Sequence, residues 1–183
     1  PCDEIAQRAR RLHPQIRTLQ EFAAAGVDGF VSMSGWSTDV IRHWAPTHIV
    51  IPCAMTIREA FLQLDAGAHF IKLLGPEVDL VRLCRSEPLF GVCPIFLTGG
   101  VTLARVPAAV NAGAVVLGSG FDLMLSGKPA NTGVEEVADV LRTYVREVSK
   151  AREAKWPALA NTSGADGETW ARSLPHLAPE ITK

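Results

Sequence analysis

A lysine in the middle of an apolar stretch is the residue of this sequence best suited to covalent chemistry. Lys72 follows Phe70 and Ile71 and precedes Leu73 and Leu74. A run that is apolar on both faces is typical of a strand in a parallel sheet covered by helices. Burial favours the neutral amine, the nucleophile that forms an imine with a carbonyl group. The alternative is a lysine that extends to water or pairs with a carboxylate, and the local sequence does not decide between the two.

Two glycine-rich turns downstream of this lysine have the composition of an anion-binding site. Thr98-Gly99-Gly100 and Gly118-Ser119-Gly120 each stand between an apolar stretch and a predicted helix. Glycine allows backbone N–H groups to approach a phosphate or carboxylate closely, and a helix N-terminus favours negative charge. Either sequence alone is equally consistent with an ordinary tight turn. Their occurrence at the ends of consecutive predicted strands favours the anion site.

Composition places the chain among ordinary globular proteins. It has 183 residues, of which 48% are hydrophobic and 20% charged, as expected for one domain with a substantial core. The formal net charge of -1, without a basic run, gives no indication of a nucleic-acid surface. No apolar run approaches the roughly 20 residues of a membrane span, and no signal or transit peptide is visible. We expect a cytoplasmic location, or an organelle such as a plastid if a presequence has been removed.

The cysteines and histidines lack the spacing of a metal site. The cysteines form no CxxC or Cys/His ligand motif, and they are Cys2, Cys53, Cys84 and Cys93. Unpaired cysteines are most often buried, so we expect reduced thiols inside the protein and no zinc site. His43, His48 and His69 likewise share no ligand spacing, and no metal is expected.

Short apolar stretches alternate with helical patterns along most of the chain. The predicted strands are residues 29–33, 48–53, 69–74, 94–97 and 114–117. The predicted helices are residues 3–12, 18–23, 38–45, 57–65, 77–85, 102–112 and 134–150. This alternation predicts βα units and a parallel sheet. An Ala-Gly pair recurs at Gly26, Gly67 and Gly113, where each helix would end in a left-handed residue.

The pattern predicts a (β/α)8 barrel whose first strands are missing or incomplete. Such a barrel has eight strands and usually about 200 or more residues. Residues 13–17 resemble the start of a strand that runs directly into a helix, so the Arg17–Thr18 junction is either a deletion or a gap. We expect residues 1–150 to form the barrel domain. Residues 151–183 would form an irregular extension that lies on the domain or on a protein partner.

Reactive residues of a parallel barrel lie at the carboxyl ends of its strands and in the loops that follow. The residues at those positions are Ser32, Ser34, Gly35, Cys53, Thr56, Lys72, Thr98, Gly99, Gly100, Gly118, Ser119 and Gly120. The set combines one cation with several hydroxyl groups and the two glycine-rich turns. It therefore has the components for a carbonyl substrate that also carries an anionic group.

From about Glu21 to Leu125 the chain resembles the 2-keto-3-deoxy-6-phosphogluconate (KDPG) aldolase / 4-hydroxy-2-oxoglutarate aldolase family. The matching stretches are VIPCAMTIRE at 50–59, Ala-Gly-Ala at 66–68 through Lys72, FLTGGV at 96–101 and Leu-Gly-Ser at 117–119. The resemblance implies a (β/α)8 barrel, usually a homotrimer. It also implies cofactor-free cleavage of a 2-keto-3-deoxy-6-phospho sugar acid or a 4-hydroxy-2-oxo acid to pyruvate and an aldehyde.

The resemblance implies a role for each matching residue. Lys72 would be the Schiff-base lysine, and Thr56 would line the pyruvyl pocket. The residues expected to hold the distal phosphate or carboxylate are Thr98, Gly99, Gly100, Gly118 and Ser119.

The chain also departs from this family. Cys53 stands where the family usually has glycine, and residues 73–76 replace an aromatic pair followed by Pro-Ala. The family's general-base glutamate and its neighbouring arginine have no match in this sequence. Glu77, the nearest carboxylate to Lys72 in sequence, is more simply an acidic residue in the first turn of a helix.

Three functions follow from these observations. The first is a Schiff-base aldolase that acts on a small 2-keto acid. The second is a catalytically impaired aldolase-fold protein that serves as a binding or structural subunit of a larger assembly, because a fold does not fix a function. The third is a phosphosugar isomerase, which would explain the glycine-rich turns but gives Lys72 no imine to form.

Overall fold

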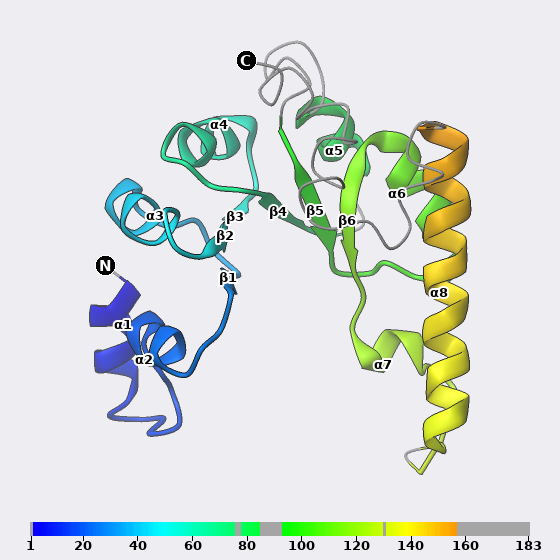
Figure 1. Cartoon of the computed structure of the whole chain (residues 1–183), viewed down its shortest axis with the longest axis horizontal. Coiled ribbons are helices and arrows are strands. Elements are labelled where there is room, and N and C mark those ends of the chain that lie inside the picture. Colours follow the sequence, from blue (N-terminus) through cyan, green and yellow to red (C-terminus); the bar gives the residue numbers. More distant parts are fainter. Residues whose placement is uncertain (1, 76–77, 85–92, 130, 157–183) are drawn as a thin grey trace. The chain divides into compact units, whose positions relative to one another are not determined.

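The computed structural model describes residues 2–75, 78–84, 93–129 and 131–156, with the side chains of residues 2–5 excepted. The described part divides into two compact units, Pro1–Leu74 and Gly75–Lys183. The predicted barrel domain of residues 1–150 and extension of residues 151–183 stay a prediction. Figure 1 shows the order of the elements along the chain.

The first unit contains short parallel strands that alternate with helices. Its elements are α1 (Cys2–Ala9), α2 (Leu19–Ala24), β1 (Gly29–Val31), α3 (Thr38–Trp44), β2 (Ile49–Ile51), β3 (Cys53–Ala54), α4 (Ile57–Asp65) and β4 (Ile71–Leu74). Strand β1 pairs in parallel with β2, and β3 pairs in parallel with β4. The strands expected at 29–33, 48–53 and 69–74 therefore form, but each is shorter than predicted.

A proline divides the strand that was predicted as one element at 48–53. Pro52 stands between β2 and β3 and has no N–H to contribute to a sheet. Its carbonyl still accepts a hydrogen bond of 2.8 Å from the Lys72 N–H. On both sides of Pro52 the segment keeps bonds to its two neighbours. Before the proline, the Val50 carbonyl accepts from the His69 N–H at 3.0 Å, and after it the Cys53 N–H donates to the Ser34 carbonyl at 3.1 Å.

The core of the first unit joins an aromatic cluster to aliphatic strand residues. The Phe30 ring lies 5.1 Å from that of Trp44 in an edge-on arrangement and is stacked on His48 at 5.0 Å. Trp44 therefore packs in the core of this unit. The largest fully buried side chains here include Ile41, Val50, Ile71 and Leu73, and they fix α3 and β4 on the strands.

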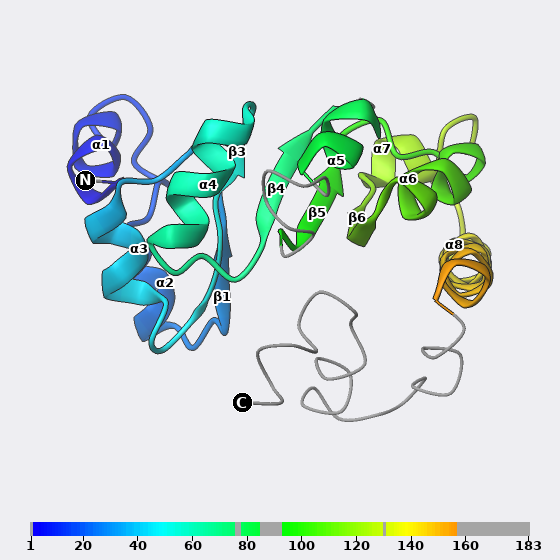
Figure 2. The same cartoon turned by 90° about the horizontal axis from the view of Figure 1, so that it is seen from above.

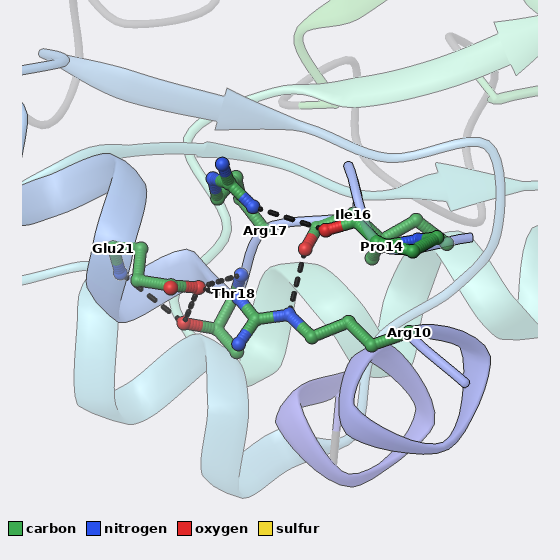
Figure 3. A network of polar contacts seen from close by, with 6 residues as sticks. All are labelled: Arg10, Pro14, Ile16, Arg17, Thr18 and Glu21. Carbon is green, nitrogen blue, oxygen red and sulfur yellow. Dashed lines mark hydrogen bonds and ion pairs between the residues drawn. The ribbon is translucent and has the colours of Figure 1, made fainter. Parts of the chain in front are cut away.

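Residues 13–17 form no strand, contrary to the expectation of a strand remnant at this point. They form a turn, in which Arg17 donates to the Pro14 carbonyl at 3.2 Å and Arg10 to the Ile16 carbonyl at 2.7 Å. Arg10 also forms an ion pair with Glu21, whose carboxylate accepts from the Thr18 N–H (Figure 3). The junction before α2 is thus held by polar contacts.

The second unit is built on one parallel strand pair covered by helices. Its elements are α5 (Val78–Cys84), β5 (Ile95–Thr98), the 3₁₀ helix η2 (Leu103–Arg105), α6 (Val106–Ala112), β6 (Ala114–Gly118), α7 (Phe121–Met124) and α8 (Val134–Lys155). Strands β5 and β6 pair in parallel, with an irregularity between Ile95 and Phe96. The sequence pattern did not predict α7.

The long helix α8 lies along α6, as both overall views show (Figures 1 and 2). It extends to Lys155, past the expected end of the domain at residue 150, and the Lys155 amine donates to the Asn111 carbonyl. The rest of the predicted extension, 157–183, lies outside the described residues, as do Glu77 and Pro76. Among the described residues, no helix combines the length and apolar character needed to cross a membrane.

The three Ala-Gly helix ends adopt the predicted conformation. Gly26, Gly67 and Gly113 have φ angles of 85°, 105° and 114°, in the left-handed region that glycine enters without a steric penalty. Each follows the last residues of a helix and precedes the approach to a strand. This part of the prediction is confirmed.

Candidate functional site

Lys72 is a buried amine in the middle of β4. The residue is 6% exposed, and its Nζ donates a hydrogen bond of 2.9 Å to the Met33 thioether sulfur. A thioether is a weak, neutral acceptor, and Lys72 forms no ion pair with a described carboxylate. The two alternatives to a buried amine, extension to water and pairing with a carboxylate, therefore do not describe Lys72 in this structure.

Cys53 occupies the neighbouring position on β3. Its Cα is paired in register with that of Lys72, and the residue is 2% exposed. Burial raises the pKa of the Cys53 thiol, while the charge of nearby Lys72 acts in the opposite direction. Cys53, Cys84 and Cys93 are all buried thiols, as predicted.

Thr56 caps the helix that follows β3. Its hydroxyl accepts from the Glu59 N–H at 3.2 Å, and the Glu59 carboxylate accepts from the Thr56 N–H at 3.0 Å and the Met55 N–H at 2.8 Å. This capping box satisfies N–H groups that have no partner within the helix. The structure therefore shows Thr56 as the cap of α4, a role that was not part of its prediction as a residue of the pyruvyl pocket.

The glycine-rich turn after β5 has the backbone conformation expected of an anion site. Gly99 and Gly100 have φ angles of 80° and 68°, so two consecutive residues lie in the left-handed region. The Thr98 hydroxyl oxygen is buried and has no hydrogen-bond partner within the described part of the chain. A buried hydroxyl that lacks a partner is costly, and a ligand atom is one way to satisfy it.

Contacts from outside the turn hold its orientation. The Gly100 carbonyl accepts from the Thr102 N–H at 3.0 Å and from the Arg105 guanidinium at 3.2 Å. The Ser119 hydroxyl donates to the Val101 carbonyl at 2.8 Å. Ser119 thus connects the turn after β5 with the turn after β6, and Arg105 supports the first turn from its outer side.

Gly118 is at a position where a larger residue does not fit. A Cβ atom there would lie 2.8 Å from both the Phe96 ring and the Thr98 methyl group. The residue pairs in register with Thr98, so the two predicted anion-binding turns begin side by side. Within the second unit the structure therefore brings Thr98, Gly118 and Ser119 together.

A cavity of about 570 Å³ in the second unit reaches this region. Gly118 and Ser119 form part of its wall, and Leu117, Leu141 and Val145 are among its apolar residues. A smaller cavity of about 180 Å³ adjoins Gly100 and Arg105. Both predicted turns therefore border space that a small molecule can enter.

Two histidines of the first unit, His48 and His69, serve packing and backbone contacts. His69 Nδ1 accepts a hydrogen bond of 3.2 Å from the Val50 N–H, and burial lowers the pKa of His69. His48 stacks on Phe30. No group of His, Cys, Asp or Glu side chains suited to a metal ion occurs among the residues described.

Sequence reasoning missed Met33 as a partner of the lysine. It follows β1, a strand that pairs with β2 and not with the lysine's strand β4, whereas the prediction took Ser32 and Ser34 from this segment and not Met33. Those two hydroxyls lie 3.4 Å from each other. No pattern in the sequence connects Met33 with a residue so distant along the chain.

No protein-family profile matches the chain, and no curated protein matches it. Among solved structures it is similar to a cube-shaped, highly porous protein cage designed by fusing symmetric oligomeric domains. The two share 25% identity over 89% of this chain, with a TM-score of 0.60. The chain spans 60% of the length of that cage protein.

Two further solved structures share the fold at lower identity. The native structure of KDPGal aldolase is 22% identical, with a TM-score of 0.61 over 81% of this chain and 76% of its own. Thiamine phosphate pyrophosphorylase from Pyrococcus furiosus is 16% identical, with a TM-score of 0.55 over 79% of this chain and 76% of its own. The chain thus has an α/β fold of the aldolase and TIM-like type, and the predicted resemblance is confirmed at the level of the fold.

Proposed function

We propose that this protein is a Schiff-base aldolase that cleaves a 2-keto-3-deoxy-6-phospho sugar acid or a 4-hydroxy-2-oxo acid. The observation that carries the proposal is the environment of Lys72. Its amine is almost fully buried and contacts a neutral sulfur. Such an amine, once deprotonated, is a nucleophile toward a ketone carbon.

The chemistry begins at the C2 carbonyl of the substrate. The Lys72 nitrogen attacks C2, and loss of water leaves a protonated imine that withdraws electrons from C3. The bond between C3 and C4 then breaks. Its electron pair forms the enamine. A water molecule takes the proton of the C4 hydroxyl group, and the C4 fragment leaves as an aldehyde. Protonation of C3 and hydrolysis release pyruvate and restore the amine.

The glycine-rich turns provide the recognition of a second, anionic group. We assign the distal phosphate or carboxylate to Thr98, Gly99, Gly100, Gly118 and Ser119. The left-handed glycines expose backbone N–H groups, and the buried Thr98 hydroxyl has hydrogen-bonding capacity to offer. Thr56 would line the pyruvyl pocket in addition to capping α4.

The scaffold in this proposal is a (β/α)8-type barrel formed by residues 1–150, with its first strands incomplete. The protein works as a homotrimer and needs no cofactor. The fold shared with KDPGal aldolase supports the barrel. The similarity to a cage designed from symmetric oligomeric domains supports self-association.

The test is pyruvate release from KDPG and from 4-hydroxy-2-oxoglutarate, measured for the wild type and for Lys72→Met. Methionine keeps the length and burial of the side chain but has no amine. We expect turnover of at least one substrate by the wild type and a loss of at least about 100-fold in Lys72→Met, because covalent catalysis is removed. Equal turnover by both proteins, or none by the wild type, would contradict the proposal.

A further inference from the structure

Cys53 and Lys72 form a pair across two parallel strands. Their Cα atoms are partners in the register of β3 and β4, and residues paired in this way direct their side chains to the same face of a sheet. Both residues are almost fully buried, at 2% and 6% exposure. A thiol and an amine thus share one face in the interior of the first unit.

Cys53 is also the ionisable group that responds to the lysine. Burial is the largest influence on the pKa of the Cys53 thiol and raises it, the positive charge of Lys72 lowers it, and the carboxylate of Glu59 on α4 raises it. These are the charged groups that face the thiol from β4 and from α4, the two elements adjoining β3. A change in the charge of Lys72 therefore changes the pKa of the Cys53 thiol.

The other side chains near Lys72 are less suited to carry a proton. Met33 contacts the amine, but a thioether has no exchangeable proton. Glu59 is exposed, and its carboxylate is held by the N–H groups of Met55 and Thr56. Cys53 stands where the resembling family usually has glycine.

We propose that Cys53 transfers the proton at C3 of a pyruvyl imine formed on Lys72, an inference that rests on the proposed function. In one direction the thiolate takes a proton from C3. The C3–H electron pair becomes the C2–C3 double bond, and the C2–N π electrons return to nitrogen as a lone pair. In the direction of cleavage, the thiol gives its proton to C3 of the enamine, and water then reprotonates the sulfur.

Pyruvate in D₂O separates the two steps experimentally. Borohydride reduction followed by peptide mapping measures the imine on Lys72, and NMR measures replacement of the C3 protons of pyruvate by deuterium. We expect Cys53→Ala to give the Lys72 adduct within about twofold of the wild type. Its C3 exchange should fall at least about 100-fold, the lower range for loss of a positioned acid or base.

Two variants serve as controls. Cys53→Ser keeps the shape of the side chain but offers a hydroxyl that is far less acidic, so it should form the adduct and fail to exchange. Cys84→Ala removes a buried thiol from the second unit and should leave the adduct and the exchange unchanged. In the wild type, the rate of C3 exchange divided by the amount of Lys72 adduct should rise with pH as the thiol ionises. This pH dependence can be measured on the wild type alone.

The outcomes distinguish the two proposals. No Lys72 adduct in the wild type would refute the proposed function and this inference with it. An adduct with wild-type exchange in Cys53→Ala or Cys53→Ser would refute this inference alone. Exchange in the wild type that does not change with pH, or an adduct without any exchange, would also overturn it.

Discussion

The hydroxyl of Thr56 and the carboxylate of Glu59 hold each other's backbone N–H groups at the start of α4. Thr56 was predicted to line a ligand pocket, and its position at the end of β3 fits that idea equally well. A helix cap and a ligand contact make different demands on the side chain. Stability measurements on Thr56 variants test the cap.

We expect Thr56→Ala to lower the free energy of unfolding by about 1 kcal/mol, the usual cost of removing a threonine cap. Thr56→Ser is the matched variant, because serine keeps the capping hydroxyl, and it should lose only a few tenths of that amount. Chemical denaturation at neutral pH provides the measurement. Equal stability of Thr56→Ala and the wild type would show that the cap contributes nothing.

The pH dependence of this cap has a definite sign. The backbone hydrogen bond from Met55 and the contacts with Thr56 hold the pKa of Glu59 below its ordinary value. A carboxyl whose pKa is lowered by folding stabilises the protein above its unfolded pKa, and the contribution is lost as the pH falls through the folded value. The capping box is therefore complete at neutral pH.

At the scale of the elements, the left-handed glycines set where helices end and strands begin. Gly26 has a φ of 85° and nothing within 4 Å of the position a Cβ would occupy. A substitution there tests backbone strain without any steric overlap with neighbours. Gly67 and Gly113 are likewise left-handed glycines at two later helix ends.

We expect Gly26→Ala to destabilise the protein by about 1–2 kcal/mol, because alanine is forced into the left-handed region. Gly26→Asn is the matched variant and should lose less, since asparagine tolerates this conformation. Thermal or denaturant unfolding of the two variants gives the comparison. The explanation fails if alanine is tolerated as well as asparagine.

The sequence was sufficient to predict the alternation of strands and helices, because apolar runs and Ala-Gly helix ends are local signals. It was also sufficient to place Lys72 on a strand between apolar neighbours. Local signals were not sufficient where contacts with residues distant along the chain determine the backbone conformation. The turn at 13–17, for example, depends on contacts from Arg10 on a preceding segment.

The candidate site shows the same limit. Glycine-rich turns and the lysine were visible as residue types, but the Met33 contact and the register of Cys53 with Lys72 depend on neighbouring strands. Ser119 was predicted to bind an anion, and the structure adds a second contact, because its hydroxyl donates a hydrogen bond to the Val101 carbonyl. The residue types were enough to predict which residues are candidates for the site. Which residues contact one another became visible only in the three-dimensional structure.

At the scale of the whole molecule, the fold relates this chain to KDPGal aldolase and to a thiamine phosphate pyrophosphorylase. Proteins of one such fold carry out unrelated reactions, so the relationship does not assign an activity. The assignment of aldolase chemistry depends on a single buried amine. The alternative, a binding or structural subunit, would leave Lys72 without covalent chemistry.

The most direct test of this account is borohydride trapping with pyruvate, read by intact mass and peptide mapping on the wild type and Lys72→Arg. Arginine keeps the charge and stays protonated, so it cannot form the imine. We predict a single reduced pyruvyl adduct on Lys72 in the wild type and none at position 72 in the variant. No adduct on folded wild-type protein, or an adduct only on other lysines, would contradict the account.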